Sequence, residues 1–188
     1  MRNRYIFSLA RGAALGSLLI LPFLSPAQST DSQAINDLLK ESEEHAILAN
    51  NDAETLESYT RGKAFSPQSH AVRLNAMKEH ANDLIVDFNK LNSLRHTGSA
   101  WQQEAIDRVD PLLKEMSAHL TNTISHFNEN KRAVNMPPFR DYVKANREYM
   151  SRASGLISAF VEYGETRAKA DYLEKTLELP ETAQVSKE

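Results

Sequence analysis

Four stretches of this chain repeat apolar residues at alternating steps of three and four, the spacing that keeps one side of a helix turned toward a partner. No stretch alternates with the period of two that marks a half-buried strand. The clearest helical stretch runs from Trp101 to Phe127. Its core side is Ile106, Val109, Leu113, Met116, Leu120, Thr123 and Phe127. The pattern predicts an all-α fold.

Local signals mark where the helices begin and end. Ser66 is suited to capping a helix and Pro67 to its first position, so a helix starts there. Gly98 ends that helix, and Ser99 with Gln102 resembles a capping box that opens the next one. The predicted helices span residues 31–60, 67–95, 99–131 and 138–179.

Two predicted helices contain a weak point. Pro111 lies inside the third helix, but the apolar spacing keeps its phase across it, which favours one kinked helix. The alternative is a fresh start with Asp110 as the cap. In the first helix, the short polar side chains of residues 50–52 compete for backbone hydrogen bonds, so the sequence leaves open whether this helix breaks there.

Short connections force consecutive helices to lie side by side and antiparallel. Because no repeat or low-complexity block interrupts the pattern, we predict a single antiparallel up-down-up-down four-helix bundle over residues 28–180. A disordered polar tail is expected over residues 181–188.

The last helix is the longest, so its final segment should overhang the other three. Ala170, Leu173 and Leu177 still form an apolar stripe along that segment. We expect the stripe to pack against the start of the first helix, because those two helices end together in an up-down bundle. The alternative is a surface for a dimer or a protein partner.

The N-terminus has the pattern of a secretory signal peptide. Arg2, Arg4 and Arg11 accompany an apolar run over residues 13–24, and small residues then lead to Ala27, after which we place the cut. The run is shorter than the ~20 residues that a bilayer crossing needs, so no permanent membrane anchor is expected after cleavage. The sequence therefore predicts a periplasmic or secreted protein.

Composition narrows the classes of partner. The predicted cleavage removes three arginines and no acid, which changes the formal net charge from −3 to −6. An acidic protein is poorly suited to nucleic acid or to an anionic membrane surface. The chain has no cysteine, so disulfides, covalently attached haem and a thiol nucleophile are all excluded.

A search for catalytic motifs finds none. No histidine is preceded three residues earlier by glutamate, which excludes the ferritin-like di-iron class. Nucleophile-elbow, zinc-protease and phosphate-loop motifs are also absent from the sequence. We therefore predict a protein that is not an enzyme.

Two repeats of methionine and histidine suggest a metal or haem site. Met77 precedes His80 by three residues, and Met116 precedes His119 in the same way. Thioether and imidazole suit copper or axially ligated haem. Counted from the connection near residue 97, the methionines are level but the histidines are offset by five residues, ~7.5 Å along the axis. We favour core packing for the methionines, with one site of Met77, Met116 and His119 as the alternative.

The third and fourth helices bring imidazoles opposite phenols. Counted from their connection near residue 134, His119 faces Tyr149 and His126 faces Tyr142. A structural interpretation is a ladder in which each pair satisfies its own polar atoms while the rings pack. A functional interpretation is a binding groove with histidine as ligand or proton acceptor. We favour the structural one, because no carboxylate is placed to orient the imidazoles.

The remaining polar candidates are weaker. His45 faces Asp83 across the first two helices as a partly exposed ion pair. His70 lies near a helix end and is expected to be solvated, as is His96. Asp83 and Asp87, one turn apart, are expected on the solvent-exposed side of the second helix.

The outline resembles the periplasmic bundles of the cytochrome b562 kind, in architecture alone. That kind binds haem through a methionine near the N-terminus and a histidine near the C-terminus. The predicted mature chain has no methionine before Met77 and no histidine after His126, so the resemblance does not imply haem.

Two functional hypotheses follow. The first is an exported, non-enzymatic bundle without a cofactor, which acts as a binding, adaptor or structural module through an unknown protein partner or self-association. The second is a bundle that carries copper or haem on His119, His126, Met77 and Met116.

Overall fold

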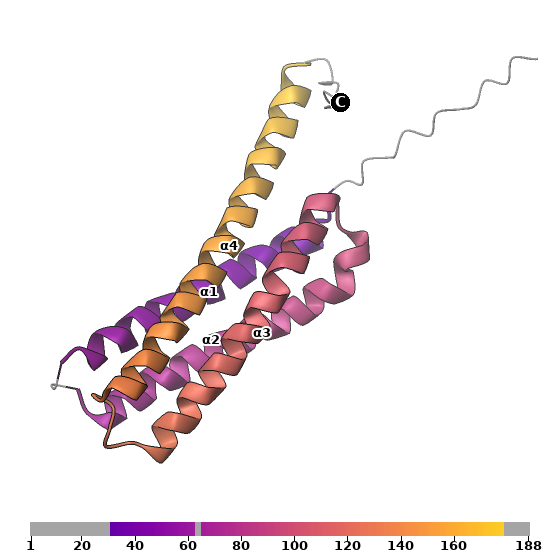
Figure 1. Ribbon diagram of the computed structural model, residues 1–188. Coiled ribbons are helices and arrows are strands. Elements are labelled where there is room, and N and C mark those ends of the chain that lie inside the picture. The colour runs from indigo at the N-terminus through magenta and orange to yellow at the C-terminus, as the bar shows by residue number, and fades with distance from the viewer. Residues whose placement is uncertain (1–30, 63–64, 179–188) are drawn as a thin grey trace, which may run out of the picture.

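A computed structural model describes residues 31–62 and 65–178 of the chain, and these residues fold into helices packed against one another (Figure 1). No strand occurs among them, so the predicted all-α class and the four helices are confirmed. The predicted signal peptide, residues 1–27, and the predicted tail, residues 181–188, lie outside the described residues. The elements are α1 (Gln33–Thr60), α2 (Pro67–Leu94), the short 3₁₀ helix η1 (Arg95–Thr97), α3 (Ala100–Glu129) and α4 (Pro137–Thr176).

The helix starts follow the signals in the sequence. Pro67 is the first residue of α2, and the Ser66 hydroxyl accepts a hydrogen bond from the Ser69 amide at 3.3 Å. At α3, the Gln102 side chain accepts from the Ser99 amide at 2.9 Å, as in the predicted capping box. The fully buried Gln102 side chain also donates to the Ser32 carbonyl at 2.9 Å, so the cap of α3 is bonded to the start of α1.

Both weak points lie inside uninterrupted helices. α1 is continuous through residues 50–52, and α3 is continuous through Pro111. The alternative of a second helix capped by Asp110 is wrong. Val109 and Leu113 are both buried on either side of the proline, so core packing holds the helix across the missing backbone donor.

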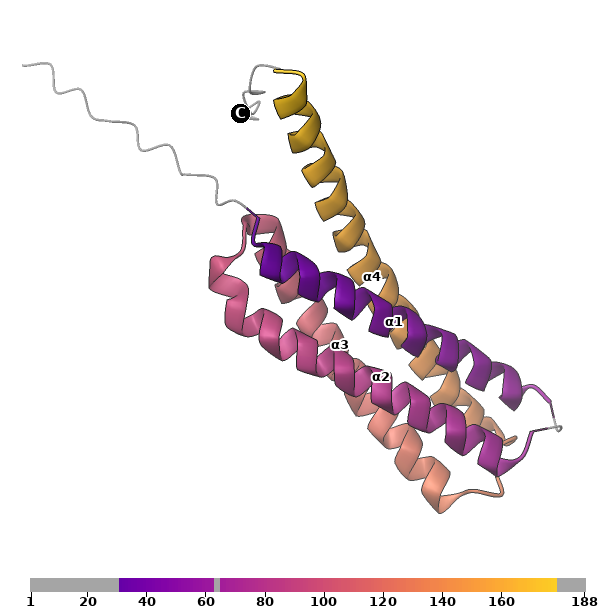
Figure 2. The ribbon, with the colours of Figure 1, turned by 180° about the vertical axis from the view of Figure 1, so that it is seen from behind.

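The core lies where the apolar sides of the four helices meet. α1 packs against α2 and α4, and α3 packs against α4 and α2 (Figures 1 and 2). On α1 the buried positions include Ala46, Ala49 and Ala53, each at most 1 % exposed. Small side chains at a helix contact permit a short distance between helix axes. None of the helices in the described part of the chain is long and apolar enough to span a bilayer.

The end of α4 leaves the bundle and projects beyond it (Figure 1). Ala170 is exposed, Leu173 is 43 % exposed and Leu177 is 61 % exposed. The expected packing of this stripe against the start of α1 is therefore wrong. The reason is helical phase, because the stripe falls about half a turn away from the buried Val161 and Gly164 at ~3.6 residues per turn.

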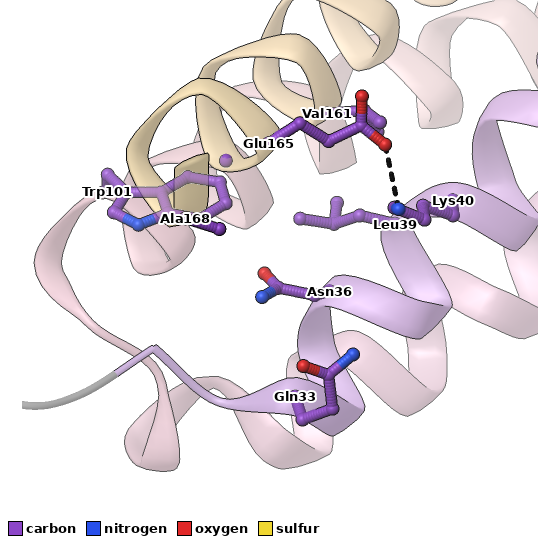
Figure 3. Close-up of a pocket in the computed structure, with 9 residues that line it drawn as sticks. Gln33, Asn36, Leu39, Lys40, Trp101, Val161, Glu165 and Ala168 are labelled. Carbon is purple, nitrogen blue, oxygen red and sulfur yellow. Dashed lines mark ion pairs between the residues drawn. The ribbon is translucent and has the colours of Figure 1, made fainter. Parts of the chain in front are cut away.

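A pocket of about 120 Å³ lies at the point where α4 leaves α1, with Trp101 and Leu39 among its walls and Lys40 paired to Glu165 at 2.7 Å (Figure 3). The hydrogen bond to Glu165 raises the pKa of Lys40 above its ordinary value. Trp101 is fixed, since its Nε1 donates to the Asp31 carboxylate at 2.8 Å.

We predict opposite effects from adding one methyl group at two glycines of α4. A Cβ at Gly164 would lie 2.7 Å from Cη2 of Trp101, whereas a Cβ at Gly155 would meet nothing within 4 Å. Gly164→Ala should lower the free energy of unfolding by about 1–3 kcal/mol through overpacking. Gly155→Ala should raise it by about 0.5–1 kcal/mol, because alanine favours the helix. Urea unfolding of both variants tests this, and equal effects at the two sites would contradict the described contact.

Candidate functional site

The imidazole and phenol rings predicted to face each other between α3 and α4 are in contact. The His119 and Tyr149 ring centroids are 4.5 Å apart with an interplanar angle of 29°, and those of His126 and Tyr142 are 5.0 Å apart at 36°. No hydrogen bond joins imidazole to phenol in either pair, so the expected mutual satisfaction of polar atoms is wrong. The rings pack against each other, and the nearest polar partner of His126 Nδ1 is the Asn130 amide at 3.5 Å.

A buried polar contact beside these rings joins the same two helices. The Asn146 amide donates to the Thr123 hydroxyl, and both residues are fully buried. Asn146 also donates to the Tyr142 carbonyl at 2.9 Å, and Thr123 donates to the His119 carbonyl at 2.9 Å. The α3–α4 contact therefore has hydrogen bonds of its own, although Asn146 Oδ1 has no hydrogen-bond partner in the described structure.

The methionine and histidine repeats do not converge on one site. Met77 and Met116 are both fully buried in the core. His80 lies between α1 and α2, 3.7 Å from the Asp52 carboxylate, whereas His119 stacks on Tyr149 between α3 and α4. The two histidines thus belong to different helix contacts.

One of the two histidines expected in solvent is buried. His96 is exposed, but His70 is 0 % exposed, so the prediction for His70 is wrong. Its ring lies edge-on to Tyr59 of α1 and to Phe139 of α4, with centroids 5.8 Å away in both cases. Aromatic residues from α1 and α4 cover the start of α2. The apolar periodicity of α2 alone could not predict this burial, because the covering residues belong to other helices.

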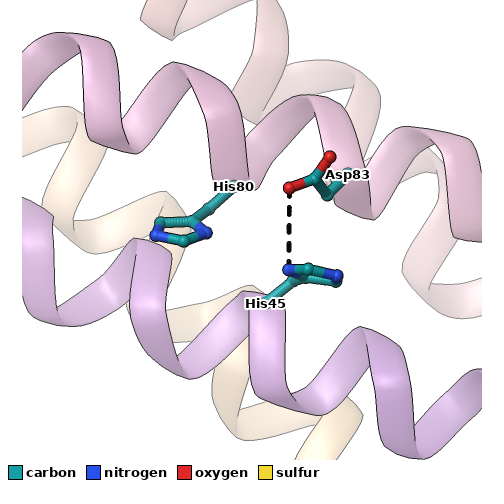
Figure 4. A group of neighbouring side chains, drawn as sticks. All are labelled: His45, His80 and Asp83. Atoms are coloured by element: carbon teal, nitrogen blue, oxygen red, sulfur yellow. Dashed lines mark ion pairs between the residues drawn. The ribbon is translucent and has the colours of Figure 1, made fainter.

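A set of imidazoles and carboxylates lies along the contact between α1 and α2. The predicted ion pair is present, with His45 Nδ1 3.7 Å from Asp83 Oδ2, and His45 Nε2 is 4.0 Å from Asp87 Oδ2. The His45 and His80 ring centroids are 6.2 Å apart, and Figure 4 shows His45, His80 and Asp83 pointing toward one another. We call this set the histidine–carboxylate cluster: Glu41, His45 and Asp52 of α1 with His80, Asp83 and Asp87 of α2.

Metal-binding atom types converge twice in this cluster. One donor atom each from His45, His80 and Asp83 lies within 4.8 Å of the other two. The same holds for Glu41, His45 and Asp87. The two sets share His45, whose two ring nitrogens are near different carboxylates.

Two carboxylates of the cluster accept hydrogen bonds from cationic side chains outside it. Arg73 Nη1 donates to Asp52 Oδ1 at 2.7 Å, while Asp52 Oδ2 is 3.7 Å from His80 Nε2. Lys90 Nζ donates to Asp87 Oδ1 at 3.0 Å. The pKa of Arg73 is raised, mainly by a hydrogen bond to Tyr59 and also by one to Asp52. The hydrogen bond to Asp87 raises the pKa of Lys90, so both cations keep their charge.

Several buried polar atoms of this region have no hydrogen-bond partner within the described structure. They are His45 Nδ1, His80 Nδ1, Asp87 Oδ2 and the hydroxyl of the neighbouring Ser42. Asp87 is only 2 % exposed. An unsatisfied buried polar group costs about 1–3 kcal/mol unless a water or a bound ion supplies the missing partner. Other buried atoms of the described structure, among them His70 Nε2 and Asn146 Oδ1, are in the same condition.

The sequence identified only part of this cluster. The prediction that Asp87 lies on the solvent-exposed side of α2 is wrong, because α1 covers it. The sequence did contain a signal for this contact. Counted in opposite directions from the connection at residues 61–66, Glu41 is level with Asp87, just as His45 is level with Asp83. Asp52 was treated only as a weak point of the helix.

Comparison of the chain with protein-family models, with curated proteins and with solved structures finds no match.

We predict that His119 stabilises the fold by stacking its ring on Tyr149, and not through a ring nitrogen. His119→Phe preserves stacking on Tyr149 and should change the free energy of unfolding by less than about 0.5 kcal/mol. His119→Ala removes the stacked pair and should cost about 1 kcal/mol. Thermal and urea unfolding give both values. A phenylalanine variant as unstable as the alanine variant would show that a ring nitrogen has a polar role.

Proposed function

We propose that this protein is an exported, non-enzymatic four-helix bundle that binds a divalent transition-metal ion at the histidine–carboxylate cluster. The observation that carries the proposal is the convergence of His45, His80 and Asp83, with a buried Nδ1 on each imidazole that has no hydrogen-bond partner in the described structure. This retains the first hypothesis of a binding module. It also moves the metal of the second hypothesis to other residues.

The donor set indicates the class of metal. Two imidazoles and a carboxylate suit Zn²⁺, Cu²⁺, Ni²⁺ or Co²⁺, whereas Mg²⁺ and Ca²⁺ prefer oxygen ligands alone. Three protein ligands leave a fourth position for water. Asp87 Oδ2 is 4.0 Å from His45 Nε2, so this carboxylate can orient the His45 imidazole from the side opposite Nδ1.

The distances are compatible with binding after a small contraction. Zinc-bound nitrogen and oxygen atoms lie ~2.0–2.2 Å from the ion, so two ligands of one zinc ion are close to each other. The donor atoms of His45, His80 and Asp83, which lie within 4.8 Å of one another, would therefore move closer together on binding. His45 Nδ1 and Asp83 Oδ2 are already 3.7 Å apart. The Asp83 side chain is 53 % exposed, so it can move inward and also gives the ion a route from solvent.

Charge and outer contacts favour a dication. The cluster has four carboxylates, and the two cations that contact it are Arg73 and Lys90, which leaves a formal excess of two negative charges when the imidazoles are neutral. Asp52 faces Nε2 of His80, the carboxylate–histidine arrangement that orients metal-binding imidazoles and leaves Nδ1 toward the ion.

The export and topology parts of the proposal rest on separate observations. The basic, apolar and small-residue segments of residues 1–27 support export. Ion pairs join Lys40 to Glu165 and Glu57 to Arg147, so residue numbers rise along α1 as they fall along α4. This order supports the antiparallel up-down-up-down topology.

We predict that purified protein without a histidine tag binds one Zn²⁺ ion per chain by isothermal titration calorimetry. His45→Ala and His80→Ala should each weaken binding more than a hundredfold, since each removes a ligand. Asp52→Asn should weaken it by about 10–100-fold, because it removes an orienting partner.

Matched controls for this titration are His96→Ala, an exposed histidine, and His119→Ala, the histidine of the α3–α4 contact. Both should bind zinc like the unmodified protein. Loss of binding in His119→Ala with full binding in His45→Ala would contradict the proposed site. Absence of any binding at millimolar zinc would contradict the function.

A further inference from the structure

The side of α4 that faces away from the bundle is exposed and carries mainly small or apolar residues, with Glu162 at its edge between Ala159 and Thr166. It lies about half a turn from the buried residues of α4 and extends from the bundle into the projecting segment. We call it the outer face of α4, and it consists of Gly155, Ala159, Thr166, Ala170, Leu173 and Leu177, all exposed. Its first and last residues are 22 positions apart, which is ~33 Å at 1.5 Å per residue.

We propose that this face pairs with the same face of a second copy of the chain, with the two α4 helices antiparallel. Such a contact is isologous, since each copy contributes the same surface. The two-fold axis passes by Thr166, which is the residue midway along the outer face. The contact is independent of the histidine–carboxylate cluster, whose residues all lie on α1 and α2.

Side-chain size supports the antiparallel register. The bulky residues Leu173 and Leu177 are at one end of the outer face, and the small residues Gly155 and Ala159 are at the other. With the axis at Thr166, Leu177 meets Gly155 of the second copy and Leu173 meets its Ala159. Gly155 has open space around the position of a Cβ, which leaves room for a leucine. A parallel pair would instead place glycine against glycine and leave a gap.

The charges beside the outer face support the same register. Glu162 and Lys169 are exposed and lie on the same edge of this face. They are nearly equidistant from Thr166, so an antiparallel pair brings Glu162 of each copy next to Lys169 of the other. A parallel two-fold pair would place these edges on opposite sides of the contact, so that Glu162 of one copy would not meet Lys169 of the other. Shape and charge therefore select the same partner, a second copy, in one orientation.

Steric access is available to the second copy. The projecting segment of α4 is exposed over most of its surface. The residues that α4 buries in the bundle lie about half a turn from the outer face. Each bundle is consequently on the far side of its own α4, and the two do not compete for the same space.

Sedimentation velocity of the purified protein with charge-reversal variants tests this inference. The unmodified protein should sediment as a dimer. Glu162→Lys and Lys169→Glu should each weaken association by about tenfold, because each places like charges together twice. The double variant should restore association. Lys175→Glu, which changes an exposed charge on the opposite side of α4, is the matched control and should leave the dimer intact.

A single introduced cysteine gives an independent test of the axis, since the chain has none of its own. Thr166→Cys should form a covalent dimer under mild oxidation, because the axis brings this position next to itself. Lys175→Cys should remain monomeric on a non-reducing gel. A monomeric unmodified protein would overturn the proposal. So would a dimer that neither charge reversal weakens, or one that cross-links at 175 and not at 166.

The two proposals fail separately. Zinc binding by a monomeric protein would remove the dimer and leave the metal site, and a charge-sensitive dimer that binds no zinc would do the reverse. Sedimentation in the presence of a chelator and with added zinc distinguishes these cases, and the dimer is expected in both.

Discussion

The structure depends on the close packing of α1 against its neighbours. Alanines at positions 46, 49 and 53 form much of the buried side of α1, and a helix contact made of small side chains is a short one. His45 and Asp52 are near these alanines in α1, and their side chains pair with Asp83 and Arg73 of α2. With no cysteine in the chain, this packing has no disulfide to support it.

That packing also explains why polar groups are buried at a cost. α1 covers Asp87 and leaves one of its oxygens without a hydrogen-bond partner, while Lys90 contacts the other oxygen. Two imidazole nitrogens nearby are in the same condition. A bound dication would satisfy nitrogen and oxygen donors together, and it would neutralise the excess of carboxylates. The polar side of the α1–α2 contact is thus understandable as a binding site, whereas the α3–α4 contact leaves one buried oxygen, Asn146 Oδ1, without a hydrogen-bond partner in the described structure.

Much of the fold was predictable, because each helix carries its own signals. Ser66, Pro67, Ser99 and Gln102 mark helix starts within one residue, and the phase of Val109 and Leu113 predicted continuity across Pro111. Counting from short connections also paired His119 with Tyr149 correctly. These successes share a cause, since they depend on local geometry or on two adjacent helices of known register.

The burial of a residue was harder to predict where it depends on helices other than the one that contains the residue. His70 is covered by Tyr59 and Phe139, which come from two other helices. The stripe of Leu173 and Leu177 was expected to be covered because it is apolar, but its phase turns it away from the core that Val161 marks. Only the His45–Asp83 pair of the histidine–carboxylate cluster was predicted, because no single helix contains a motif and the other residues come together only through the register between α1 and α2.

The most direct test of the central claim is anomalous diffraction from crystals of the protein grown with zinc. We predict one strong anomalous peak between His45, His80 and Asp83, with Asp83 drawn toward the ion. A peak between α3 and α4 at His119 or His126 would contradict it. So would the absence of a peak with the side chains of the cluster closed onto one another.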